Sequence, residues 1–292
     1  MRVDSRTPRR TASVLLAGLM AAAAVPAVSQ ISIHREILRS SEREVKIDIE
    51  LSFGTVEIAR AAPGFILQAD YEGPKDDRQP FEVSYDIVDG RGELTIRSKE
   101  ESFWKGATRD SHADDRHWQL MITDEVPLTM NIEFGAGEGT VDLTGLRIHD
   151  LQMSSGASAV DMLCAEPNTL RASRVTIESG VSRFTAKGLA NLNFRRFKFS
   201  GGIGSYKLDF TGSLVESATA TIDVGLGSVI VTLPHGIPAQ IEYEKNWFSS
   251  FDVDDAFVET SDDVFETKDF DRADRRLTLR IQSGMGSVKV RR

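Results

Sequence analysis

The sequence predicts an all-β fold, a β-solenoid-like stack of repeats of about 22 residues. Three observations support this fold class. A glycine-containing motif recurs along the chain, each copy leads into alternating apolar and polar residues, and the sequence after residue 29 shows no helical periodicity. Each repeat is too short for a propeller blade, so a solenoid rung is the expected structural unit.

The recurring motif is a glycine, any residue, glycine or serine, any residue, and then alternating apolar positions. Six copies begin at Gly137, Gly156, Gly180, Gly202, Gly225 and Gly284. A seventh begins at Ser52, where serine replaces the first glycine. The first four spacings are 19, 24, 22 and 23 residues, whereas the last is 59. We therefore expect an insertion before the final copy, with an acidic part over residues 251–274.

Each copy predicts a short strand whose alternate residues face the core. The expected inward pairs are Val141/Leu143, Val160/Met162, Phe184/Ala186, Tyr206/Leu208, Val229/Val231 and Val288/Val290. A second alternating run lies between successive copies, as in Phe197-Lys198-Phe199. Two short strands per repeat are therefore expected.

The region before the repeats predicts a β-hairpin that caps the stack. Alternating runs at 45–49, 81–85 and 94–96 read as strands, and Asp89-Gly90 between the last two is a hairpin turn signal. A polar loop at 99–117 precedes a further strand at 118–122. We expect this region to cover the open edge of the stack.

The N-terminus has the pattern of a signal peptide over residues 1–29. Arginines precede an apolar stretch from Ala12 to Val25, and small residues precede Gln30. We expect a linker at 30–43, a single β domain at 44–292, and no spanning segment beyond the signal peptide. The mature protein is expected to be periplasmic or extracellular.

Charge and cysteine content argue against nucleic-acid binding and against an intrachain disulfide. The net charge of −9 becomes −12 once residues 1–29, with four arginines and one aspartate, are removed. This charge repels phosphate backbones, so nucleic-acid binding is not expected. Cys164 is the only cysteine, so an intrachain disulfide is excluded and a buried thiol is expected.

Taken together, these motifs resemble the toast-rack family over roughly residues 44–292. The resemblance is carried by Trp118, Pro127, DLTGLRIHDLQMSSGAS from Asp142, Pro167-Asn168, GVSRF from Gly180, GGIGSYKLDFTG from Gly201 and GLGSVIVTLPHGIPAQI from Gly225. It implies the extracytoplasmic domains of Lia-type proteins, which respond to cell-envelope stress and wall-active antibiotics. It carries no catalytic residues over to this chain, and the helix bundle of the membrane-tethered members is missing.

One pair of residues raises an enzymatic alternative. Aligning the motif copies puts Asp142 and Asp161 at the same outward position of adjacent rungs, with Lys207 further along the stack. Paired carboxylates can serve as acid and base in polysaccharide cleavage. Thr185 and Ile230 interrupt the column, however, and outward charges are expected on any solvated sheet. We expect no catalytic residues.

No cofactor or metal site is expected. His112 and His117 lie near Asp110, Asp114 and Asp115, but their spacing matches no ligand motif, so a polar loop is expected. The acidic stretch 251–274 lacks the glycine and glutamate spacing of an EF-hand, which leaves calcium binding as an alternative to a charged surface loop.

Three aromatic residues are the candidate partner-binding site. Trp247, Phe248 and Phe251 lie at the start of the insertion, where exposed aromatic side chains often anchor a partner. We expect an exported, non-catalytic scaffold that binds or senses an envelope protein or a cell-wall-related ligand, in an envelope-stress response. The alternatives are a surface adhesin or structural scaffold, and a carbohydrate-active enzyme using Asp142 and Asp161.

Overall fold

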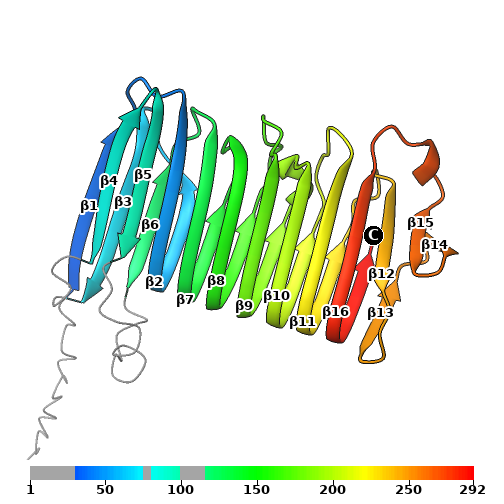
Figure 1. The fold of residues 1–292 in the computed structure, drawn as a ribbon. Coiled ribbons are helices and arrows are strands. Elements are labelled where there is room, and N and C mark those ends of the chain that lie inside the picture. Colours follow the sequence, from blue (N-terminus) through cyan, green and yellow to red (C-terminus); the bar gives the residue numbers. More distant parts are fainter. Residues whose placement is uncertain (1–29, 75–79, 99–115) are drawn as a thin grey trace, which may run out of the picture.

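The computed structural model describes residues 30–74, 80–98 and 116–292 and confirms the all-β stack (Figure 1). The strands of this part form one 16-stranded sheet. Seven long strands pair in parallel in the order β2-β7-β8-β9-β10-β11-β16. They are β2 (Glu44–Arg60), β7 (Leu128–Asp142), β8 (Ile148–Leu163), β9 (Arg174–Lys187), β10 (Arg196–Asp209), β11 (Ala218–Thr232) and β16 (Leu277–Arg291).

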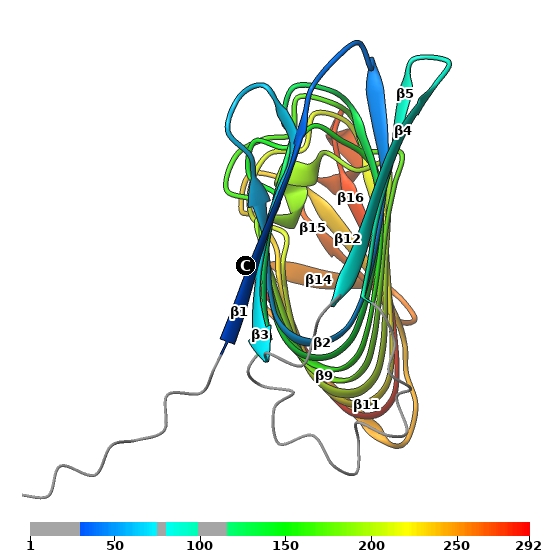
Figure 2. The ribbon, with the colours of Figure 1, turned by 90° about the vertical axis from the view of Figure 1, so that its left-hand side faces the viewer.

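Each long strand forms a U-shaped rung by itself, so the two short strands expected per repeat are one continuous strand (Figure 2). In β11 the inward residues are even-numbered up to Val224 and odd-numbered from Val229, because the strand turns at Gly225-Leu226-Gly227. We call the part before this turn the first wall, the three residues the bend, and the part after it the second wall. All the predicted inward pairs are buried.

Loops cross from the second wall of one rung to the first wall of the next. Buried asparagines satisfy their backbone groups: Asn168 donates to the carbonyls of Ile148 (2.7 Å) and Leu192 (3.2 Å), and Asn191 donates to that of Cys164 (2.9 Å). A short 3₁₀ helix, η2 (Leu189–Leu192), lies in one of these loops. The loops thereby close the top of the core with satisfied polar groups.

The repeats are in register, but the first one starts two residues earlier than the sequence alignment suggested. Ala136, not Glu138, pairs with Ala157 of the next rung, so the bend of β7 is Gly135-Ala136-Gly137. Glycine alternates with other residues through Gly139, and the motif therefore fits this segment in two ways. Burial of Phe134 at the base of the first wall selects the earlier start.

At the N-terminal end the two walls continue as separate arms. β5 (Arg91–Ser98) and β4 (Phe81–Val88) extend the first wall, whereas β6 (His117–Ile122), β3 (Phe65–Pro74) and β1 (Gln30–Leu38) extend the second. Tyr71, Phe81 and Trp118 pack between the arms, with ring centroids 4.4–5.9 Å apart. The predicted hairpin is present, but residues 30–38 of the expected linker form β1, because Ile31, Ile33 and Ile37 pack against the core.

At the C-terminal end, the 59-residue gap between the last two copies of the motif contains a further rung and a cap, where the sequence predicted an insertion. β12 (Ala239–Glu244) and β13 (Ser249–Val253) form the two walls of this rung, and both pair with β16. β14 (Phe257–Ser261), β15 (Val264–Thr267) and the 3₁₀ helix η3 (Phe270–Arg272) follow across the end of the stack. Their buried side chains Phe257, Phe265 and Phe270 cover the core there.

Candidate recognition surface

The bend of each rung turns one side chain out of the stack. In β11 this residue is Leu226, between Gly225 and Gly227. Gly227 has φ +140°, and a Cβ there would lie 1.9 Å from the carbonyl oxygen of Gly204 on the neighbouring rung. Only glycine allows this backbone angle and this close approach, and so the residue between the glycines points to solvent.

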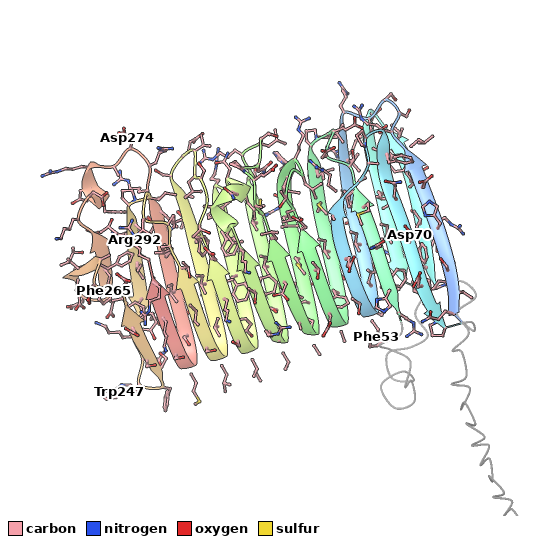
Figure 3. All side chains as sticks on the ribbon, turned by 180° about the vertical axis from the view of Figure 1, so that it is seen from behind. Phe53, Asp70, Trp247, Phe265, Asp274 and Arg292 are labelled. Atoms are coloured by element: carbon pink, nitrogen blue, oxygen red, sulfur yellow. The ribbon has the colours of Figure 1, made fainter. Side chains whose placement is uncertain are left out.

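Large apolar residues occupy this outward position in four consecutive rungs. Val181, Ile203, Leu226 and Met285 are paired in register, and their exposed fractions are 62%, 52%, 44% and 49%. Side chains project from the bends along the lower edge of the stack (Figure 3). Exposed apolar residues arranged contiguously, unlike scattered ones, mark interaction surfaces.

The rung formed by β12 and β13 continues this row with Phe248. The backbone N–H of Gly286 donates to the carbonyl of Phe248 (3.0 Å), which places Phe248 beside Met285. Asn246 accepts from the N–H of Phe248 (2.9 Å) and donates to the carbonyl of Ser283. Phe248 is 70% exposed. We name Val181, Ile203, Leu226, Met285 and Phe248 the apolar ridge, about 19 Å long at ordinary strand spacing.

Of the three predicted aromatic residues, two lie at the surface. Trp247 is 98% exposed and marks the end of the apolar ridge (Figure 3). Phe251 instead stacks on Tyr243, with ring centroids 4.1 Å apart and planes at 11°, and it also contacts Phe265. The end of the stack is therefore held together by Phe251, while Trp247 and Phe248 are available to a partner.

The other members of the apolar ridge were not identified from the sequence. They occupy the variable position of the motif, whereas its recurrence is defined by the glycines on either side. The signal lies in that variable position, which is valine, isoleucine, leucine and methionine in the four copies from Gly180 onward. A polar residue is expected at an exposed turn, so this run of apolar residues is the informative feature.

The register contradicts the carboxylate pair of the enzymatic alternative. Asp142 pairs with Leu163, whereas Asp161 pairs with Thr140, so the two aspartates are offset by two residues along the strands. Asp142 instead accepts a hydrogen bond from the N–H of Thr144 (2.9 Å), and Asp161 faces Arg183 at 3.9 Å. The alignment error at Gly137 caused the mistaken pairing.

The acidic residues of 251–274 are dispersed over the end of the stack. Asp252 pairs with Arg291, and Lys245 pairs with Asp263 (2.8 Å) and Glu259 (3.0 Å). Within 30–74, 80–98 and 116–292 there is no group of three or more potential metal-ligating side chains. His117 begins β6, and residues 99–115 of its predicted polar loop, His112 among them, lie outside the described residues.

Cys164 is buried, as the sequence predicted, with an exposed fraction of 2%. Its Sγ lies 3.4 Å from the carbonyl oxygen of Glu166. Burial raises the pKa of the Cys164 thiol to about 12, and the charges of Asp142 and Glu166 act in the same direction. The thiolate, which is the reactive species, is therefore disfavoured at neutral pH.

We accordingly expect Cys164 to resist thiol reagents in the native protein. A colorimetric thiol assay at neutral pH should detect almost no reaction until denaturant is added, when the single thiol should titrate fully. Rapid reaction of the folded protein at the same pH would contradict the burial of this side chain.

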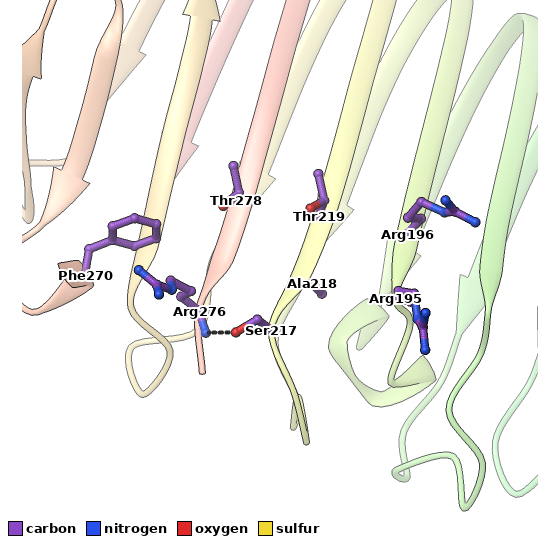
Figure 4. Close-up of a pocket in the computed structure, with 8 residues that line it drawn as sticks. All are labelled: Arg195, Arg196, Ser217, Ala218, Thr219, Phe270, Arg276 and Thr278. Carbon is purple, nitrogen blue, oxygen red and sulfur yellow. Dashed lines mark hydrogen bonds between the residues drawn. The ribbon is translucent and has the colours of Figure 1, made fainter. Parts of the chain in front are cut away.

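A basic depression of about 390 Å³ lies on the outer surface near the top of the first walls. Arg195, Arg196 and Arg276 line it together with hydroxyl groups, and Arg276 lies over the ring of Phe270 at 5.4 Å. The three guanidinium groups point in different directions (Figure 4). Because these groups do not converge on one point, they do not form a binding site for a single anion.

The fold and the exposed row define a class: extended all-β proteins of parallel U-shaped rungs with an exposed apolar edge. Residues 25–187 match the family described as the N-terminal domain of toast_rack, DUF2154. This match covers more than half of the chain, which therefore belongs to the toast-rack family, as the motifs indicated. No curated protein matches the chain.

Solved structures similar to this chain include a candidate cell adhesion protein from Clostridium sporogenes. It is 14% identical, with a TM-score of 0.47, over 90% of this chain and 99% of its own. A candidate adhesin from Bacteroides fragilis is 13% identical, with a TM-score of 0.44, over 91% of this chain and 98% of its own. In the part of this chain that the structure describes, no helix is long and apolar enough to cross a membrane.

Proposed function

We propose that this toast-rack protein is an exported, non-catalytic scaffold of the cell envelope that binds a partner along the apolar ridge and Trp247. The observation that carries the proposal is the contiguous exposure of five large apolar side chains on one edge of the stack. Half of the exposed large apolar side chains in the described residues belong to the ridge and Trp247. Export is supported by the basic and apolar order of residues 1–29.

The rigid stack suits such a role because it holds the ridge in a fixed geometry. Val181, Ile203, Leu226 and Met285 are each set by a glycine-containing bend and by parallel pairing on both sides. Phe248 is held by the pairing of its rung with β16 and by the hydrogen bond that its N–H donates to Asn246. A preorganised surface loses less conformational entropy on binding than a loop does. Binding of this kind would serve the sensing of envelope stress, the role that the family resemblance suggests.

Site-specific crosslinking in intact cells tests the proposal. A photoreactive amino acid at Met285 should give a discrete adduct with an envelope protein, and the same probe at Val215 should not. Val215 is a matched control because it is 56% exposed but lies in a loop away from the ridge.

The aromatic end of the surface gives a second arm of this experiment. We expect Trp247→Ala with Phe248→Ala to reduce the Met285 adduct strongly while leaving the melting temperature unchanged, because both side chains are solvent-exposed. Phe251→Ala should lower the melting temperature, since its ring packs on Tyr243. An undiminished adduct in the Trp247/Phe248 variant would place the binding surface elsewhere.

A further inference from the structure

We infer that the apolar ridge receives the apolar face of a basic amphipathic helix from a partner protein. This inference rests on the binding role proposed above and specifies the chemistry of the partner. Three observations carry it: the charges beside the ridge, the hydroxyl groups on its other side, and the spacing of both.

A row of carboxylates runs beside the ridge on the outer face of the first wall. Glu133, Glu178, Asp223 and Glu244 occupy the outward position nearest the bend in every second rung, and Ser154, Ser200 and Gln282 lie between them. We call these four residues the acidic row. Glu178, Asp223 and Glu244 form no ion pair with any residue of the described part. They remain free to pair with cations of a partner.

The opposite flank of the ridge is neutral where the largest apolar residues lie. Ser205, Ser228, Ser287 and Ser250 are paired in register directly after the bends, and Arg183 takes the same position in the rung of Val181. Lys207 and Lys289 lie one outward position further along the second wall. A partner that places apolar side chains on Ile203, Leu226, Met285 and Phe248 therefore meets carboxylates on one side and hydroxyl groups on the other.

The spacing of these groups fits a helix that lies along the stack. Neighbouring rungs are about 4.8 Å apart, close to the 5.4 Å rise of a helical turn. In an extended strand, side chains on one face recur at about 6.6 Å, which fits less well. Members of the acidic row recur at about 9.6 Å, near the 10.5 Å that separates residues seven apart in a helix.

The same features disfavour two other occupants. The acidic row and the net charge of −12 for residues 30–292 repel the anionic lipids of a membrane surface. A second copy would bring its own acidic row and its own net negative charge to the ridge, and like charges brought together oppose association. A basic helix both neutralises the carboxylates and covers the apolar side chains.

The binding of designed peptides to the purified protein tests this inference. Two peptides of about 18 residues, some 27 Å of helix, carry the same leucine face. One has lysines at the flanking positions and the other has glutamates. We expect the lysine peptide to bind and the glutamate peptide to bind at least about 10-fold more weakly.

Paired variants separate the contributions of the ridge and the acidic row. Ile203→Ser with Leu226→Ser should lower the affinity for the lysine peptide by about 10-fold or more. Val215→Ser with Val258→Ser, similarly exposed valines off the ridge, should change binding less than about twofold. Glu178→Gln with Asp223→Asn should weaken binding and flatten its salt dependence, whereas Asp255→Asn with Asp262→Asn, exposed at the capped end, should not.

Several outcomes would overturn the inference. Equal binding of both peptides, or binding that the Ile203/Leu226 variant leaves unchanged, removes its basis. Binding to anionic lipid vesicles that the Ile203/Leu226 variant abolishes would assign the ridge to a membrane surface. Self-association that the same variant abolishes, seen by sedimentation, would assign it to a second copy. A Met285 adduct in cells without lysine-peptide binding would retain the binding role and reject the helix.

Discussion

Replacing Phe184 by alanine is expected to lower the free energy of unfolding by about 3–5 kcal/mol. Phe184 is fully buried in the centre of the stack, where it lies between Val160 and Tyr206 on the neighbouring rungs and contacts the ring of Phe199 at 5.4 Å. Rungs on both sides hold their positions, so the cavity left by the ring has little freedom to collapse. Chemical denaturation followed by circular dichroism measures the change.

Val181→Ala provides the comparison within the same strand. Val181 lies three residues earlier on the apolar ridge and is 62% exposed, so its truncation should change stability by less than about 0.5 kcal/mol. Similar losses for the two variants would mean that the side of the strand facing the core has been misassigned.

Gly227→Ala is the second substitution for which we expect a large effect, a loss of at least about 1–3 kcal/mol. The added methyl group meets the carbonyl oxygen of Gly204 at 1.9 Å while the backbone angle φ is +140°. Neither problem can be relieved without separating two paired rungs. Gly236→Ala is the control, because no atom lies within 4 Å of the position its methyl group would take and φ there is outside the left-handed region. Thermal unfolding measures the melting temperatures of both variants. Equal melting temperatures would contradict the close packing at the bends.

The inward residues of the rungs were predictable because alternation is a local property. Phe184, Tyr206 and Val229 all face the core, as their spacing indicated. The bend was not predictable as part of one strand, since glycine usually reads as a break in a strand. The offset at Gly135 and Gly137 had the same origin, because a motif of alternating glycines fits the template twice and burial of Phe134 decides between the two fits.

Features that depend on distant parts of the chain were beyond local patterns. The pairing of β16 with β11 and β12 joins segments far apart in sequence, so the repeat spacing alone suggested an insertion where the structure has another rung. The candidate site was predicted in part. Trp247 and Phe248 lie at the surface, as exposed residues of a binding site would. Predicting the rest of the ridge would have required knowing which residues the bends turn outward.

The position of β16 also determines the order in which the molecule can be completed. Along the seven long strands, β7 to β11 can each pair on a strand already made, so this part can grow as the chain emerges from a ribosome or a translocon. The rung of β12 and β13 cannot, because the long strand that it pairs with, β16, follows it in the sequence. Pairing of this rung therefore requires that β16, made later, enters between β11 and β12. A chain lacking residues 277–292 would expose the edge of β11 and leave Phe248 without the strand that positions it, so the C-terminal part of the stack and of the apolar ridge both depend on β16.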